Sequence, residues 1–371
     1  MQPTTELDPR QANLSPSEIW SPGRFFISLL GLIVTFAVLW LGFLFLRDNT
    51  LPQVLNGVIA IIWGVGGIAL LFFVANMVAE SLPRLWQGRI QPYIFVGPAV
   101  AFLVWFLFVP TLRTIYQSFF NADSSTFVGL DNYAATFTDR DMLESFRNNL
   151  LWLFLGTATC VILGLLIAVL ADRSKFETVA KALIFMPMAI SFVGAGVIWR
   201  FVYAYAPVEQ TQIGALNAII VSLGGQPQAW IATAPWNNLF LIIVLVWMQT
   251  GFAMVLFSAA LKGVPADLLE AARIDGASEV QTFFSIIVPY IQGTIVTVTT
   301  TIAIFTLKIF DVVIVMTGGQ YGTEVVATQF FRQFFNNRNF GYGSAIAIVL
   351  FIAVLPVMIY NLRQLRKQEG F

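Results

Sequence analysis

A polar segment between two long apolar runs carries the residue types best suited to binding a partner protein. It reads Pro265-Ala-Asp-Leu-Leu-Glu-Ala-Ala-Arg-Ile-Asp-Gly-Ala-Ser-Glu-Val-Gln. Glu270 and Asp275 offer charged hydrogen-bond acceptors, and Ala271 and Ala272 are small enough to let another surface come close. Gly276 can adopt the left-handed backbone that ends a helix abruptly. The segment therefore favours docking.

Local signals predict that this segment folds as helix, turn, helix. Pro265 suits the first helical position, and Asp267 lies where the positive end of the helix dipole favours a carboxylate. Ser278 with Gln281 three residues on is typical of a capping box that starts a second helix. The first helix would have an apolar side, formed by Leu268, Leu269, Ala272 and Ile274, which needs a partner surface. An amphipathic helix resting on a membrane is the alternative interpretation.

Composition excludes several kinds of chemistry. The chain has no histidine and one cysteine, Cys160, so histidine catalysis and intrachain disulfides are impossible, and the most common metal ligand is missing. We expect no catalytic residues and no metal site. Twenty basic residues balance twenty acidic ones, so no basic stripe for nucleic acid is expected. No Gly-x-x-x-x-Gly-Lys-Ser/Thr occurs, so no P-loop site for ATP is expected in this chain.

The rest of the chain reads as membrane-spanning helices. Of its 371 residues 58% are hydrophobic and only 11% are charged, far from the balance of a soluble domain. The chain contains about eight apolar runs of roughly 20 residues or more, and in lipid such runs must satisfy their backbone groups internally. This predicts an all-α protein with about eight transmembrane helices. The seventh run contains Pro289, so its start is expected to be interfacial or kinked. The runs are Phe25 to Leu46, Val54 to Val78, Tyr93 to Phe119, Leu150 to Ala171, Val179 to Tyr203, Asn238 to Leu261, Phe283 to Met316 and Tyr342 to Leu362.

Charge distribution predicts that both termini are cytoplasmic. Basic residues concentrate around Arg173 to Lys181 and in the tail Arg363 to Lys367, whereas the stretch Pro207 to Pro235 has none. Residues 1–24 are polar and lack the apolar core of a cleavable signal, so we expect a cytoplasmic tail. Two leading transmembrane helices at 25–92 and a six-helix core at 93–371, with the polar loop at 265–289, complete the predicted organisation.

The polar loop resembles the EAA signature of permeases in binding-protein-dependent ABC importers. The resemblance rests on Glu270-Ala-Ala, Asp275-Gly-Ala and the ending Ile286, Val288, Pro289, with valine in place of the usual leucine. It implies the type I ABC importer fold, in which this loop is a coupling helix seated in a cleft of the ATPase. The coupling residues it implies are Glu270, Ala271, Ala272, Asp275 and Gly276.

Further motifs resemble the sugar-type, or maltose-type, permeases. These are Pro110-Thr-Leu-Arg-Thr-Ile-Tyr-Gln-Ser-Phe, Phe127-Val-Gly-Leu-Asp-Asn-Tyr, Phe310-Asp-Val-Val-Ile-Val-Met-Thr-Gly-Gly and Phe340-Gly-Tyr-Gly-Ser-Ala. Two departures stand out: Gln320-Tyr321 replaces the usual Gly-Pro, and the stretch Asn121 to Arg147 is too short for the large external domain of the enterobacterial maltose permease. The two leading helices resemble the longer member of the permease pair.

The same resemblance implies a solute site near mid-membrane, on the sixth and seventh runs. Aromatic faces and neutral hydrogen-bonding groups there suit an uncharged polyhydroxylated solute, and Gln249 is the strongest candidate because an amide in lipid needs a partner. The alternative is that the aromatics are packing and the threonines bond their own helix. Lys308 and Asp311, three apart, could pair on one helix face. The candidate substrate-binding residues are Trp247, Gln249, Phe252, Thr299, Phe305 and Thr306.

The resemblance also implies partners. It predicts an importer of oligosaccharides, glucosides or small glycosylated osmolytes in the bacterial inner membrane. In such an importer this chain pairs with a second permease subunit as a heterodimer. An ABC ATPase dimer holding ATP and Mg, and an extracytoplasmic solute-binding protein, complete it. An ion-driven secondary transporter of a neutral solute is the competing hypothesis; intramembrane acidic residues and an inverted repeat, its usual marks, are not evident.

Overall fold

The computed structural model describes residues 22–368, and the chain divides into two compact units, one ending at Leu112 and the other starting at Arg113. In the described part every named element is helical, as predicted. Six helices are long and apolar enough to span a membrane, or eight spans if each of two bent pairs counts as one. The prediction of about eight transmembrane spans is confirmed. The predicted domain boundary at 92/93 stays a prediction.

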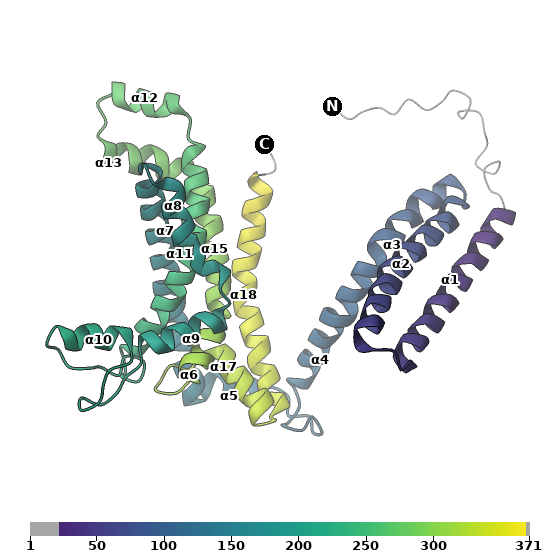
Figure 1. The fold of residues 1–371 in the computed structure, drawn as a ribbon, viewed down its shortest axis with the longest axis horizontal. Helices are drawn as coiled ribbons and strands as arrows, with labels where there is room; N and C mark the ends of the chain where they lie inside the picture. Colours follow the sequence, from purple (N-terminus) through teal and green to yellow (C-terminus); the bar gives the residue numbers. More distant parts are fainter. Residues whose placement is uncertain (1–21, 369–371) are drawn as a thin grey trace. The chain divides into compact units, whose positions relative to one another are not determined.

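The first unit is a helical hairpin followed by a third helix (Figure 1). Close approach of the first two helices is fixed by Gly42, where an added Cβ would lie 2.0 Å from the Trp63 ring. Asn49 donates a 2.8 Å hydrogen bond to Asn56 and closes the hairpin. Phe72 stacks on Phe95 between the second and third helices. The elements are α1 (Pro22–Asp48), α2 (Gln53–Glu80), α3 (Arg84–Leu103), the π-helix η1 (Val104–Phe108) and α4 (Val109–Gln117), of which α4 crosses the boundary between the units.

The second unit contains the loop and the candidate site. Its hairpin and spanning helices are α5 (Asp131–Thr138), α6 (Arg140–Leu151), η2 (Trp152–Gly156), α7 (Thr157–Asp172), α8 (Glu177–Phe185), η3 (Met186–Ala189), α9 (Phe192–Val202), α10 (Ala215–Ser222) and α11 (Asn237–Lys262). The remainder comprises α12 (Ala266–Ile274), α13 (Glu279–Thr282), η4 (Phe283–Ile287), α14 (Val288–Tyr290), α15 (Gln292–Leu307), α16 (Asp311–Met316), α17 (Val326–Phe331), η5 (Arg332–Asn336) and α18 (Phe340–Gln368).

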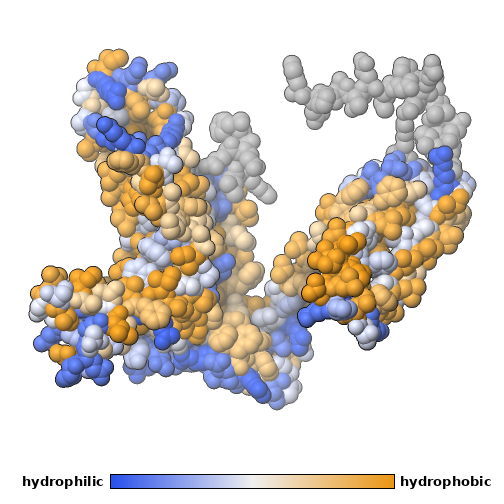
Figure 2. All heavy atoms as spheres, viewed as in Figure 1, coloured by the Kyte–Doolittle hydropathy of each residue, from blue (hydrophilic) through white to orange (hydrophobic). Residues whose placement is uncertain are grey.

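Helix α11 is the centre of the second unit. Around it lie two apolar clusters, one including Trp152, Leu241 and Val312, the other Phe257 and Ile302. Figure 2 shows an apolar band along the spanning helices of this unit, with polar residues at the end formed by α12 and α13 and at the opposite end near α6 and α10. A band of this kind between polar ends is what a bilayer requires of a spanning bundle.

The fifth predicted run is not one continuous helix. Pro187 removes a backbone donor, the chain tightens into the 3₁₀ turn η3, and Ser191 starts a new helix by accepting a 3.0 Å bond from the Gly194 N–H. Helices α8 and α9 therefore meet at 103°, a break that periodicity did not predict.

The seventh run is bent, as its proline predicted, by 69° between the segments Glu279–Tyr290 and Gln292–Leu307. It is also broken a second time, because α15 ends at Leu307 and α16 begins at Asp311. The prediction that Lys308 and Asp311 share one helix face is therefore wrong. Lys308 instead lies with its ammonium 6.0 Å from the centre of the Phe305 ring.

Candidate functional site

The polar loop is a helix, a tight turn and a second helix, as its sequence predicted. Helix α12 begins at Ala266, one residue after Pro265, so the proline precedes the helix instead of occupying its first position. Gly276 has φ +77°, the left-handed conformation expected of it. The Ala277 N–H donates to the Ala272 carbonyl at 3.0 Å and the Gly276 N–H to Arg273 at 3.1 Å. These two bonds satisfy carbonyls that the helix end would otherwise leave open.

A capping box starts α13, which confirms the second local prediction. The Gln281 N–H donates to the Ser278 hydroxyl at 3.3 Å, and the Gln281 side chain accepts from the Ser278 N–H at 2.8 Å. Both turns of the loop are thus fixed by local bonds. Its geometry is set before any partner binds.

Most of the residues predicted to couple the loop to a partner ATPase are exposed. Glu270, Ala271, Asp275 and Gly276 are exposed, while Ala272 is buried. Ile274 is 86% exposed, an unusual state for an isoleucine that lies outside the apolar band. The exposed surface therefore combines carboxylates, small residues and one large apolar side chain, which suits a protein cleft.

Two contacts attach the loop to the spanning helices. Arg173, just after α7, donates a 3.0 Å bond to Glu279 at the start of α13. The Tyr290 hydroxyl donates to the Gly263 carbonyl at the end of α11, at 3.3 Å. Movement of the loop would consequently pull on the ends of α7 and α11.

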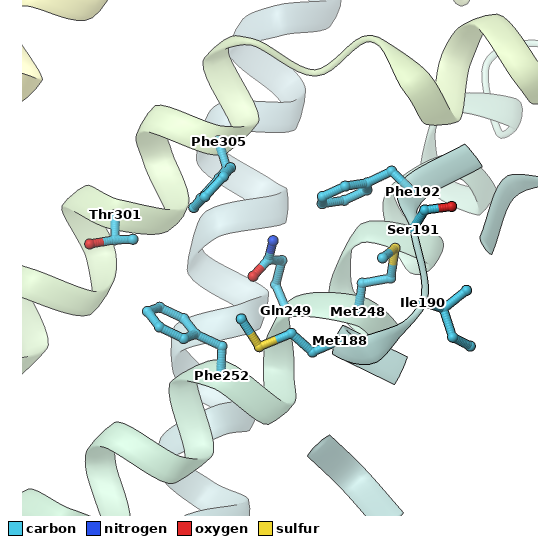
Figure 3. Close-up of a pocket in the computed structure, with 9 residues that line it drawn as sticks. All are labelled: Met188, Ile190, Ser191, Phe192, Met248, Gln249, Phe252, Thr301 and Phe305. Atoms are coloured by element: carbon cyan, nitrogen blue, oxygen red, sulfur yellow. The ribbon is translucent and has the colours of Figure 1, made fainter. Parts of the chain in front are cut away.

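A cavity of about 350 Å³ lies where η3 and the start of α9 face α11 and α15. Figure 3 shows the Gln249 amide directed into its centre, with Phe305 and Thr301 on one side and Phe252, Met188 and Phe192 around it. Gln249 is 6% exposed, and among the described residues its amide makes no hydrogen bond to protein. Every side chain lining the cavity is uncharged. The full lining is Met188, Ile190, Ser191, Phe192, Met248, Gln249, Phe252, Thr301 and Phe305.

Three of the six predicted substrate-binding residues line this cavity, namely Gln249, Phe252 and Phe305. Thr306 does not, because it is fully buried and donates a 2.8 Å bond to the Ile302 carbonyl of its own helix. Trp247 packs edge-on against Trp199, with ring centres 5.7 Å apart. Thr299 lies six residues before Phe305 on α15 and outside the lining.

Six lining residues were missed by sequence reasoning. Four of them come from the unpredicted break between α8 and α9, namely Met188, Ile190, Ser191 and Phe192. Pro187 followed by Ser191 is a signal that could have found this break, since proline ends a helix and serine begins one. Met248 and Thr301 neighbour predicted residues, and Thr301 donates a 2.8 Å bond to the Thr297 carbonyl.

An all-α bundle with bent spans, a capped loop helix and an uncharged internal cavity is typical of a membrane transport subunit. Residues 160–367 match the family described as binding-protein-dependent transport system inner membrane component. The chain belongs to this family. It is a multi-pass permease component of such a system, not an enzyme.

Curated relatives cover about three quarters of the chain. It is 54% identical over 276 residues to the osmoprotective compounds uptake permease protein GgtC of Synechocystis, covering 74% of this chain and 99% of the relative. It is 48% identical over 284 residues to the alpha-glucoside transport system permease protein AglF of Rhizobium meliloti, covering 76% and 84%.

Solved structures share the fold. A bacterial ABC transporter involved in the import of the acidic polysaccharide alginate contains a chain that aligns with TM-score 0.65 at 19% identity, over 76% of this chain and 99% of that one. A chain of a bacterial alginate ABC transporter in complex with an alginate pentasaccharide-bound periplasmic protein aligns with TM-score 0.66, also at 19% identity, over 77% of this chain and 99% of that one. The type I importer fold predicted from the EAA resemblance is confirmed.

Proposed function

We propose that this chain forms half of the translocation pathway of an ATP-driven importer of neutral sugars, of the oligosaccharide or glucoside class. The observation that carries the proposal is the cavity around Gln249: within residues 22–368 its lining has no charge, and its central amide has no protein partner. A buried amide without a partner is costly, so a solute hydroxyl that bonds it gains free energy. The names of the relatives GgtC and AglF support osmoprotective or alpha-glucoside solutes.

The aromatic lining supports the same solute class. Phe192, Phe252 and Phe305 present ring faces and edges on three sides of the amide (Figure 3). Rings pack against the C–H faces of a sugar ring, while Ser191, Gln249 and Thr301 offer groups that bond hydroxyls. A charged solute would find no counter-ion in this lining and would bear the cost of desolvation in full. An ion-driven secondary transporter is not supported, because the family is binding-protein-dependent.

The energy for transport comes, in this proposal, from ATP and Mg held by a partner ATPase dimer. Glu270, Ala271, Asp275 and Gly276 form the surface that docks into it, with the buried Ala272 packed beneath them, and the double capping of the loop supports a rigid connector. A second permease subunit completes the pathway as a heterodimer, and an external solute-binding protein delivers the solute. Both termini then lie in the cytoplasm with the α12–α13 loop, and the α6 and α10 end faces outward.

Calorimetry of the binding protein that serves this importer tests the solute class. The protein is titrated with a panel of glucosides, maltodextrins, glycosylated polyols, amino acids and inorganic ions. The proposal expects saturable heat with one or more neutral glycosides and none with the amino acids or ions. If only amino acids or ions bind, the sugar assignment is wrong, whereas the coupling assignment is unaffected.

A further inference from the structure

Charged and polar side chains from three helices meet at the end of the second unit that adjoins the α12–α13 loop. The Lys181 ammonium donates to Asp172 and to Ser258, and at 2.6 Å to Glu177. The Ser258 hydroxyl donates to the same Asp172 oxygen at 2.7 Å. Lys262 donates to Glu177. We call these five residues, Asp172, Glu177, Lys181, Ser258 and Lys262, the helix-end cluster.

The inner part of the helix-end cluster is shielded from water. The side chains of Lys181 and Asp172 are 18% and 16% exposed, and Ser258 is buried. By contrast the Arg47–Asp48 pair is more than half exposed on both sides. A charge pair that is removed from water and held by a third polar group is less screened, so breaking one partner is costly. Lys181 thus joins α8 firmly to α7 and α11.

Close packing continues this connection into the bundle. At Gly251 of α11 an added Cβ would lie 2.5 Å from the Ile184 carbonyl of α8. At Gly164 of α7 it would lie 2.4 Å from the Ala253 Cβ of α11. Helices this close have no room to slide independently, because packed interiors behave as rigid bodies over short distances. The three helices therefore move together at this end.

The joined helices α7, α8 and α11 connect the α12–α13 loop to the wall of the cavity. In one direction, α11 ends at Lys262 and only Gly263 to Pro265 separate it from α12, while Arg173 bonds Glu279 of α13. In the other direction α8 continues into η3, whose Met188 lines the cavity. Seven residues separate Lys181 from Met188, about 10 Å at 1.5 Å per helical residue. Lys181 lies between the loop and the cavity wall.

We propose that Lys181 is a positioning residue that transmits movement of the α12–α13 loop to the wall of the cavity at Met188 to Phe192. This inference rests on the coupling role proposed above for the loop. Without the Lys181 charge, α8 loses its bonds to Asp172 at the end of α7 and to Ser258 of α11, and it keeps only the more exposed Lys262–Glu177 pair within the helix-end cluster. The loop then moves on ATP binding, but η3 follows it less.

The experiment measures movement at the cavity wall without needing the transported solute. In the complete importer in proteoliposomes, Cys160 is changed to Ser and Met188 to Cys, which gives one thiol beside the cavity. The rate of its reaction with a hydrophilic maleimide is compared without nucleotide and with ATP and vanadate, and the difference is normalised to the trapped nucleotide. In this parent we expect at least a fivefold change in rate. Lys181→Met, added to the parent, is expected to reduce the normalised change to less than twofold.

Two further variants separate a positioning role from a general loss of structure. Lys181→Arg keeps the charge and is expected to restore most of the change, and Arg147→Met removes a charge from an exposed pair elsewhere and is expected to leave it intact. If Lys181→Met does not accumulate in the membrane, Ser258→Ala, which removes one bond to Lys181, is expected to diminish the change partially. A parent-like change in Lys181→Met or in Ser258→Ala, or no change in the parent, overturns the proposal.

A last variant distinguishes the two proposals. Glu270→Ala in the same parent removes a loop contact and leaves the helix-end cluster intact. If Glu270→Ala abolishes the change, the coupling role is supported. If Glu270→Ala keeps the change and Lys181→Met loses it, the coupling role of Glu270 is wrong and the role of Lys181 stands.

Discussion

Arg332 donates a 2.5 Å hydrogen bond to Glu324, whose side chain is only 7% exposed. Both residues lie at the end of the second unit opposite the coupling loop, where α6 and α11 hold the turn after α16. Asn148 of α6 donates to the Glu324 carbonyl at 2.8 Å, and Asn237 of α11 to the Tyr321 carbonyl at 2.6 Å. Burial raises the pKa of Glu324 to about 7, even though Arg332 acts in the opposite direction.

Glu324 gives the protein a pH-dependent stability. Its carboxyl has a pKa of 4.5 in the absence of the fold and about 7 within it, so between these values the folded state holds a proton that the unfolded state lacks. The free energy of unfolding therefore falls as pH rises from about 4.5 through about 7. We expect the thermal midpoint of Glu324→Gln to change little between pH 5 and pH 8. At pH 8 it should be higher than the midpoint of the unsubstituted protein. Glu209→Gln, at an exposed carboxyl, should retain the original pH dependence, and a slope unchanged in Glu324→Gln would contradict the assignment.

Gly276 is required for the turn of the coupling loop. Its φ of +77° is a conformation in which a side chain costs roughly 1–2 kcal/mol, although the space around it is open. We expect Gly276→Val to leave the protein in the membrane but to reduce solute uptake by the reconstituted importer at least tenfold, because α13 is redirected. Gly57→Ala, a helical glycine with equally open surroundings, is the matched control and should transport normally. Full uptake by Gly276→Val would show that the turn does not require glycine at this position.

Glu270 is exposed on α12 and forms no hydrogen bond to protein within residues 22–368, so its carboxylate is available to a partner. We expect Glu270→Ala to lower uptake at least tenfold while ATP hydrolysis continues, measured side by side in proteoliposomes. Asp267→Asn, in the first turn of the same helix, removes only a favourable dipole contact worth about 0.3–1 kcal/mol and should leave the ratio of uptake to hydrolysis unchanged. Equal ratios in both variants would remove Glu270 from the coupling surface.

The sequence was most informative where bonds are local. Gly276, Ser278 and Gln281 act on neighbours within a few residues, and the loop they define was predicted in detail. Apolar runs also predicted the spans, because lipid leaves a helix as the only solution for an isolated run. The second break of the seventh run was missed, since Lys308 to Phe310 contain neither glycine nor proline. Tertiary contacts, not local propensity, end α15 there.

The cavity was predicted less completely for a physical reason. Gln249 and Phe252 were identified because the family resemblance directed attention to the sixth run, where an amide and an aromatic ring suit a sugar. Ser191 and Met188 enter the lining only because α8 and α9 meet at 103°, and hydrophobic periodicity does not register a change of helix direction. Thr306 shows the converse: a threonine in the right run bonds its own backbone and lies away from the cavity.

Gly251 has a packing role that the sequence alone did not reveal. An added Cβ would lie 2.5 Å from the Ile184 carbonyl and 2.7 Å from the Phe185 Cα, and backbone atoms cannot rotate away. We expect Gly251→Ala to lower the thermal midpoint in detergent, at an overpacking cost of about 1–3 kcal/mol. Gly66→Ala in α2, where an added Cβ meets nothing, is the control and should be neutral or slightly stabilising. An unchanged midpoint in Gly251→Ala would mean that α8 and α11 separate without cost.

Gln249 offers the sharpest test of the cavity as the solute site. Replacing the amide by an apolar group of similar size removes hydrogen bonds to a solute hydroxyl worth about 0.5–1.5 kcal/mol each. We therefore expect Gln249→Leu to raise the solute concentration for half-maximal uptake by about 2–13-fold per bond lost. The protein itself should be no less stable, since the amide bonds none of the described residues. Thr306→Val, a buried threonine outside the cavity, is the matched control and should keep the original concentration dependence. The decisive measurement is uptake against concentration for both variants in proteoliposomes with the same binding protein. If Thr306→Val impairs uptake as strongly as Gln249→Leu, the effect belongs to packing along the helices and not to a solute bound at the amide.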